Sequence, residues 1–213
     1  MELSENQNIE QTLQRRAGTL LAVGGVGFFL AGAIHPAGKP GQDFHTAIVS
    51  MLNDPAWPVA HWCALVSALL VALAFFLMIE RRESPRARTG IRLGILATAF
   101  MAVEFAVEIA ARAEAAPLAS GAAAPFVSLI DAMQAVGFPA FAVTFILVAT
   151  GTRWTPGWVA ALAVIGGAAL GVGGLVVQGM HVVVLGPVFL LGNLLPVWMI
   201  WAGIRLARER APL

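Results

Sequence analysis

Long apolar stretches recur along the chain, most of them separated by short polar connections. They cover residues 17–34, 58–79, 90–111, 125–149, 156–177 and 183–206. A helix needs about 20 residues to cross roughly 30 Å of hydrocarbon, so each stretch is long enough. The runs are continuous, unlike the alternating pattern of a membrane β-strand. The pattern therefore predicts an all-α polytopic membrane bundle with six transmembrane helices, and residues 1–213 as one integral membrane domain.

The two connections of most interest are the N-terminal segment, residues 1–16, and the long connection between the first two stretches, residues 36–57. The first 14 residues carry three acidic residues and no basic one, unlike the basic start of a signal peptide. We therefore expect the first stretch to remain as an uncleaved anchor. The long connection has apolar residues at helical spacing, which predicts a short amphipathic helix that lies over the outer end of the bundle as a lid: Phe44, Ile48, Met51 and Leu52.

Basic residues divide unevenly between the two sides of the predicted bundle. Eleven of the 13 fall in segments on the side of the N-terminus, whereas Lys39 and Arg112 lie on the other side. Cytoplasmic loops of membrane proteins are enriched in Lys and Arg. This predicts that both termini, including residues 1–16, are cytoplasmic and that the 36–57 connection is external, in a bacterial-type inner membrane. An odd number of spans would break the pattern.

Composition agrees with a membrane protein in contact with the lipid bilayer. Apolar residues make up 59% of the chain and charged residues only 12%, against roughly a quarter charged in soluble domains. The arginines are explained by topology and the net charge is only +1, which argues against a nucleic-acid partner. The single cysteine, Cys63, excludes an internal disulfide. The six tryptophans lie mostly near span ends, where the membrane interface accounts for them.

Polar residues within and beside the predicted spans converge on the outer half of the membrane. Ionisable groups at membrane depth are costly unless they are paired or hydrated, and they usually mark a functional site. The opposite half is almost entirely apolar. The residues that converge are His35, His45, His61, Glu104, Glu108, Arg112, Asp131, Gln134, Gln178 and His181.

The third span carries Glu104, Glu108 and Arg112 at intervals of four residues, so they share one helix face. Arg112 is a local partner for Glu108, which predicts an ion pair near the outer interface. Glu104 lies one turn too deep for that partner. It must therefore be protonated, hydrogen-bonded to another helix or bound to a cation.

Histidine and carboxylate groups together are the ligands of transition metals. We expect His35, His61, His181 and Glu108 to be candidate metal ligands, although compact spacings such as HxxxH or HExxH are absent from the sequence. Alternatively, two of the histidines clamp a haem iron. Arg112, Gln134 and Gln178 are then the candidate cofactor-binding residues. The leading hypothesis is a metal- or haem-binding pocket with redox or lipid-directed chemistry at the outer face.

Two other hypotheses stay open, and the sequence does not decide whether the protein is an enzyme. Glu104 and Asp131 form a candidate catalytic pair of carboxyl groups that relays protons or protonates an apolar, lipid-like substrate. The protein is then a proton-coupled carrier or a lipid-binding accessory subunit of a membrane protein partner, without a metal. In the remaining alternative, the polar groups only hydrogen-bond one another and set the helix register.

The distribution of basic residues predicts the outcome of reporter fusions. A reporter fused after Leu213 should be active in the cytoplasm, and one inserted between Lys39 and Asp54 should be active outside. Paired reporters that are active on opposite sides of the membrane measure this. A cytoplasmic result for the insertion in the 36–57 connection would invert the predicted orientation.

Overall fold

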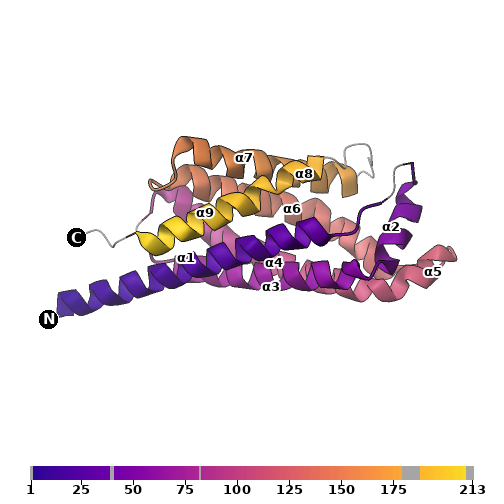
Figure 1. Ribbon diagram of the computed structural model, residues 1–213, viewed down its shortest axis with the longest axis horizontal. Coiled ribbons are helices and arrows are strands. Elements are labelled where there is room, and N and C mark those ends of the chain that lie inside the picture. Colours follow the sequence, from indigo (N-terminus) through magenta and orange to yellow (C-terminus); the bar gives the residue numbers. More distant parts are fainter. Residues whose placement is uncertain (1, 39–40, 82, 179–187, 210–213) are drawn as a thin grey trace.

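The protein is an elongated bundle of α-helices (Figure 1). The computed structural model describes residues 2–38, 41–81, 83–178 and 188–209. Within these residues six helices are long and apolar enough to cross a membrane, which confirms the predicted all-α class and the predicted number of long apolar helices. They are Asn8–Ile34, Ala56–Leu77, Pro85–Ala119, Pro125–Gly151, Gly157–Val176 and Leu190–Arg208.

The helical elements follow one another closely along the chain. Prolines begin α4 and α6, where the missing N–H is harmless. The elements are α1 (Glu2–Ile34), α2 (Phe44–Asn53), α3 (Ala56–Leu77), α4 (Pro85–Ala111), the 3₁₀ turn η1 (Arg112–Glu114), α5 (Ala115–Ala119), α6 (Pro125–Gly151), α7 (Gly157–Val172), the π-helical turn η2 (Gly173–Gln178), α8 (Val188–Gly192) and α9 (Leu194–Arg208).

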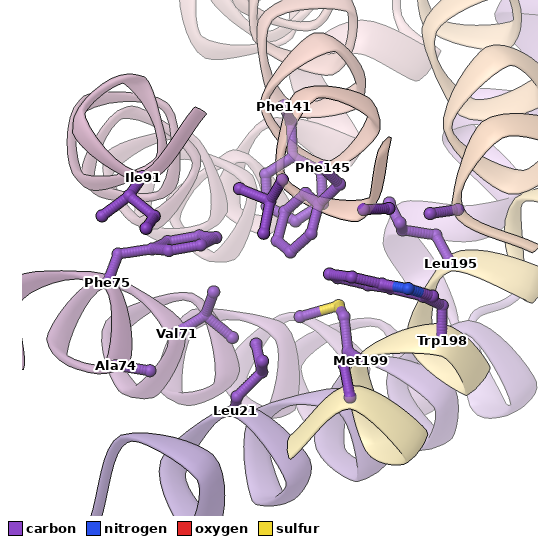
Figure 2. Close-up of a cluster of buried hydrophobic side chains, with 14 of the residues drawn as sticks. Leu21, Val71, Ala74, Phe75, Ile91, Phe141, Phe145, Leu195, Trp198 and Met199 are labelled. Atoms are coloured by element: carbon purple, nitrogen blue, oxygen red, sulfur yellow. The ribbon is translucent and has the colours of Figure 1, made fainter. Parts of the chain in front are cut away.

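The long helices form a closed ring. Each packs on the next one in the chain, in the order α1, α3, α4, α6, α7 and α9, and α9 returns to pack on α1. Large side chains from five of these helices fill the centre (Figure 2). There the Phe145 ring lies between Phe75, at 5.4 Å between ring centroids, and Trp198, at 5.9 Å. All three side chains are buried, so this part of the bundle is a dry, packed core.

The closure between α1 and α9 depends on two glycines that face each other. A Cβ atom at Gly203 would lie 2.4 Å from the backbone oxygen of Gly18 and 2.4 Å from the backbone nitrogen of Ala22. A Cβ atom at Gly18 would lie 2.5 Å from the backbone nitrogen of Ala207. The two backbones therefore approach as closely as small residues allow, which is a common way of packing membrane helices.

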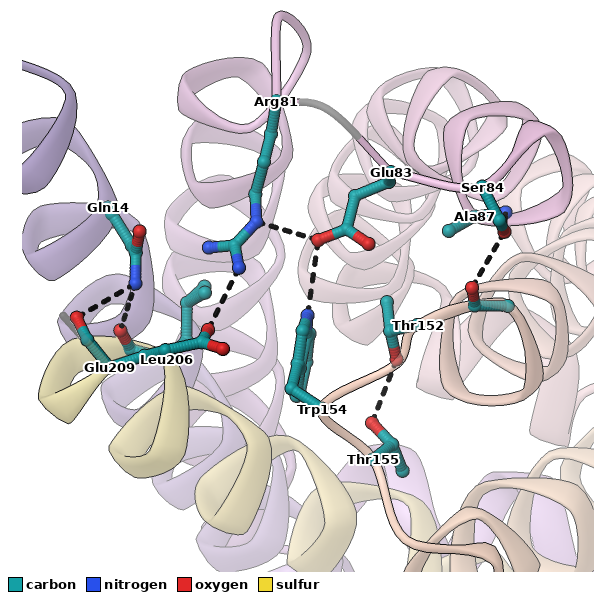
Figure 3. Close-up of polar contacts among 11 residues, drawn as sticks. Gln14, Arg81, Glu83, Ser84, Ala87, Thr152, Trp154, Thr155, Leu206 and Glu209 are labelled. Carbon is teal, nitrogen blue, oxygen red and sulfur yellow. Dashed lines mark hydrogen bonds and ion pairs between the residues drawn. The ribbon is translucent and has the colours of Figure 1, made fainter. Parts of the chain in front are cut away.

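The end of the bundle where α1 begins and α9 ends is tied together by polar contacts (Figure 3). Arg81 pairs with Glu83, at 2.6 Å between Nε and Oε1, and with Glu209, at 2.8 Å between Nη2 and Oε2. Gln14 Nε2 donates to the backbone oxygens of Leu206 and Glu209. The start of α1 and the end of α9 thus lie at the same end of the bundle, as an even number of spans requires. The side of the membrane they face stays a prediction.

The amphipathic helix expected in the 36–57 connection is present as α2, at the opposite end of the bundle from the Arg81 contacts (Figure 1). Its N-terminus is capped by Asp43, whose carboxylate accepts the Thr46 backbone N–H at 2.9 Å and the Thr46 hydroxyl at 2.7 Å. These hydrogen bonds favour the ionised carboxylate and hold the pKa of Asp43 below its ordinary value.

Two boundaries differ from the sequence prediction. Helix α1 begins at Glu2, so the polar segment before Ala17 continues the first span as helix. The sixth span is interrupted at Asn193, between α8 and α9. Pro196 explains this break, since a proline lacks the N–H that would bond to the backbone oxygen of Gly192 four residues earlier.

The packing of α1 against α9 predicts a strong size effect at Gly203. Gly203→Leu should lower the free energy of unfolding by about 1–3 kcal/mol, because overpacking forces the helices apart. Gly157→Leu is the matched control, since a Cβ atom there would meet nothing within 4 Å. Unfolding in mixed micelles by titration with a denaturing detergent measures both variants. Equal stability of the two would contradict the close contact.

Candidate functional site

Helix α2 covers a second apolar cluster at its end of the bundle. The buried members of this cluster are Leu52, Trp57, Ala111, Ala115 and Ile130. The His45 ring nitrogen Nε2 lies 3.1 Å from the backbone oxygen of Leu118 and donates to it, which connects α2 to α5. The α2 segment is therefore docked onto the bundle as a lid.

A cavity of about 70 Å³ lies beneath this lid. Its apolar side is formed largely by side chains of α2 and α6, together with Trp57 of α3. Its polar side is formed by His35, Glu108, Asp131 and Gln134. The volume is several times the roughly 10–15 Å³ that one water requires, and the polar side supplies hydrogen-bonding partners. Water can therefore occupy this cavity.

Glu108 of α4 is the centre of the polar side. The residue is only 3% exposed. Its Oε1 atom accepts a 2.6 Å hydrogen bond from Gln134 Nε2 of α6, and its Oε2 atom lies 3.0 Å from His61 Nε2 of α3. Its backbone oxygen accepts a 2.8 Å hydrogen bond from Trp57 Nε1. Three helices thus meet at this residue.

The hydrogen bonds of His61 determine how its ring is protonated. The Nδ1 atom lies 2.6 Å from the backbone oxygen of Trp57. A carbonyl oxygen only accepts, so Nδ1 must carry a proton. The contact between Nε2 and Glu108 Oε2 therefore holds one further proton, either on the imidazole or on the carboxyl group. In both forms His61 and Glu108 together are electrically neutral, which allows the pair to be buried.

His35 lies at the edge of this cluster, directly after α1. The residue as a whole is exposed, but its ring packs 5.0 Å from the His61 ring and 5.5 Å from the Trp57 ring, between centroids. This packing desolvates the imidazole, and the neighbouring His61 disfavours a second positive charge. Together they lower the pKa of His35. The polar side of the cavity thus begins at His35, near the surface, and continues to the buried side chains of Glu108 and Gln134.

Glu104 lies one helical turn deeper than Glu108 and is 0% exposed. Neither of its carboxyl oxygens has a hydrogen-bond partner among the residues that the structure describes. Glu108 and Gln134 are the polar groups that interact electrostatically with its carboxyl group. Gln134 Oε1 also lacks a partner within the described part of the chain. The deepest polar position of the site is therefore the least satisfied.

The expected ion pair between Glu108 and Arg112 is wrong. Glu108 is buried and pairs with His61, whereas Arg112 is exposed where α4 gives way to the turn η1. The direction in which the side chain of Glu108 points explains the difference, since it faces α3 and α6 in the bundle interior. Glu104 interacts electrostatically with the carboxyl group of Glu108, while Asp131 is half-buried and lines the cavity. The pairing of Glu104 with Asp131 stays a prediction.

Two of the sequence candidates fall at the edge of what the structure describes. Gln178 is the last residue of η2, and its side chain lies outside the described part, as does the whole of His181. Among the described residues, no three His, Cys, Asp or Glu side chains are grouped so as to hold a metal ion. Metal or haem binding thus stays a prediction.

Sequence reasoning missed the roles of Trp57 and Glu114. Trp57 is buried and supports the backbone of Glu108, whereas its position near a span end indicated the membrane interface. The Glu114 carboxylate accepts the backbone N–H groups of Phe126 and Val127, both at 3.0 Å, and so caps α6. These bonds join residues at least 12 positions apart, so no local pattern indicates them.

The neutral pair predicts strong coupling between His61 and Glu108. His61→Leu should lower the free energy of unfolding by about 3–5 kcal/mol, because it leaves a buried carboxyl group without its partner. The double variant with Glu108→Leu should lose much less than the sum of the two single variants. Detergent titration of all four proteins measures this. Additive losses would contradict the shared proton.

Comparisons with known proteins give no indication of the chemistry of the site. No protein-family model, no curated protein and no solved structure matches the chain. The function of the protein is therefore inferred from the geometry around Glu104 and Glu108.

Proposed function

We propose that this multi-pass membrane protein is a proton-coupled carrier. In this proposal Glu104 exchanges a proton with the cavity under α2 through His61, Glu108 and Gln134. The observation that carries the proposal is the burial of Glu104 without a hydrogen-bond partner among the described residues. One turn away, Glu108 accepts a hydrogen bond from Gln134 and lies 3.0 Å from His61 Nε2.

The free-energy cost of burying a charge supports a proton on Glu104. An isolated carboxylate is among the most expensive groups to bury in apolar surroundings, whereas the neutral acid is much cheaper. A structural role alone would favour an apolar residue or an amide at this depth, because neither can become charged. A carboxyl group that is neutral when the lid is closed and ionised when it is hydrated fits a coupling residue.

The neighbouring groups form a short path for that proton. Glu104 has no hydrogen bond to this pair in the described geometry, so the transfer requires a bridging water or a side-chain rotation. The proton between His61 Nε2 and Glu108 Oε2 then passes to the Glu104 carboxylate, which breaks an N–H or O–H bond and forms an O–H bond on Glu104. Water in the cavity then returns a proton to the pair. Gln134 holds Glu108 by its 2.6 Å hydrogen bond and thereby keeps the carboxyl group in position.

The rest of the bundle favours a carrier over a proton channel. Beyond Glu104 the interior is occupied by the aromatic side chains of Phe141, Phe145 and Trp198 (Figure 2). Such a packed core offers no continuous row of water or hydroxyl groups. A proton that reaches Glu104 must therefore return the same way or wait until the helices move, and this is how a carrier couples a proton to a ligand.

A metal or haem site, with redox or lipid-directed chemistry, is the second candidate. One observation favours it: the Nδ1 atoms of His35 and His61 both contact backbone oxygens, at 2.8 Å and 2.6 Å. This contact commonly orients a metal-binding histidine and leaves Nε2 for the metal. In the described geometry, however, His61 Nε2 already contacts Glu108.

The carrier proposal predicts a reversible protonation change at Glu104. Infrared difference spectra of the purified protein in lipid vesicles, recorded between acidic and alkaline pH, should contain a carboxylic-acid band that titrates. Glu104→Gln should remove this band, because the amide cannot exchange a proton. Asp131→Asn is the matched control and should keep the band.

The same preparations separate the other hypotheses. Stoichiometric metal or a haem absorption band that is lost in His61→Ala would favour the second candidate. A Glu104 band that stays unchanged at every pH would contradict the carrier. If Glu104→Gln also folds and behaves as the parent protein does, the polar cluster is structural, as expected for an accessory subunit.

A further inference from the structure

The cavity beneath α2 lacks a hydrogen-bond donor for part of its polar side. Gln134 lines this cavity and is 6% exposed. Its Nε2 atom donates to Glu108, which determines how the amide is oriented, and its Oε1 atom has no partner within the described residues. A buried acceptor without a donor costs about 1–3 kcal/mol. A ligand that donates a hydrogen bond would recover that cost.

The other polar groups of the cavity point to a positively charged ligand. Glu108 contributes a carboxyl group, and no lysine or arginine is present among the described residues that line the cavity. The pair of His61 and Glu108 is neutral while it holds the shared proton and carries one negative charge without it. A monovalent cation that displaces this proton therefore restores the neutral charge of the site. Binding of the cation and release of the proton are then linked.

The apolar side of the cavity determines which chemical groups and what size the uncharged part of the ligand can have. Ile48, Met51 and Leu52 of α2 and the indole ring of Trp57 line it. An alkyl group packs well against these side chains, and a cation gains further from the face of an aromatic ring. The volume of about 70 Å³ admits only a few non-hydrogen atoms. A protonated primary amine with a short alkyl chain has the required donors, charge, apolar part and size.

We propose that the cavity binds a small alkylammonium ion, with its ammonium group on Gln134 and Glu108 and its alkyl group against α2. This inference rests on the proposed function, for which it names the ligand class. The carrier exchanges the ion for the proton held by His61, Glu108 and Glu104. Leu52 of α2 and Trp57 of α3 are buried where the lid meets the bundle, so movement of α2 away from α3 would open the cavity further to the ion.

Calorimetric titration of the purified protein with ethylammonium tests this inference. We expect saturable binding at one site with release of one proton, measured as the dependence of the binding heat on the ionisation enthalpy of the buffer. Ethanol, which has a similar size and no charge, should not compete. Tetraethylammonium should not bind, since it lacks an N–H group and exceeds the cavity.

Gln134→Leu should weaken ethylammonium binding tenfold or more, because it removes the acceptor and keeps the size. Thr144→Val is the matched control: Thr144 is also in α6, fully buried and without a hydrogen-bond partner for its hydroxyl group among the described residues. It lies about 15 Å further along the helix, so binding should be unchanged. Met51→Trp should fill the cavity and abolish binding while the fold stays intact.

Three results would overturn the inference: no saturable binding of ethylammonium, equal competition by ethanol, or unchanged binding in Gln134→Leu. Its failure is distinguishable from failure of the proposed function. A titrating Glu104 band without ethylammonium binding leaves the carrier and removes this ligand class. Ethylammonium binding without a Glu104 band leaves a cation site that is not coupled to protons.

Discussion

The three-helix junction at Glu108 is the interaction on which the polar end of the protein depends. A buried carboxyl group in a membrane bundle is stable only if its neighbours share its charge or its proton. Here His61 of α3 shares the proton, Gln134 of α6 donates to the other oxygen, and Trp57 holds the helix backbone. Rotating any one of these helices about its axis would break the arrangement. The junction therefore sets how α3, α4 and α6 face one another.

The two ends of the bundle balance different physical demands. The centre is a dry core around Phe145 and Trp198, and the end near Arg81 is tied by polar contacts between loops. The other end has a polar cavity under a small lid, α2. The lid α2 is less extensively packed than the long helices are against one another.

Because the helices form a ring, side chains from several segments line the site. Because consecutive helices are neighbours and α9 returns to α1, the ends of α1, α3, α4 and α6 near α2 meet around the cavity. The close approach of Gly18 and Gly203 closes this ring. Helix α1 also packs directly on α3, and His35 at the end of α1 lies against Trp57 and His61.

Hydropathy by itself determined the helical class, the six spans and the gathering of polar residues towards one end, because span length and depth are local properties of the chain. The short helix α2 followed from the spacing of four apolar residues in the same way. Which polar groups meet was decided only by tertiary structure. Glu108 selects His61 over Arg112, and Glu114 caps α6 from another segment. Such pairings depend on helix rotation and on neighbours distant in sequence, and no local pattern contains that information.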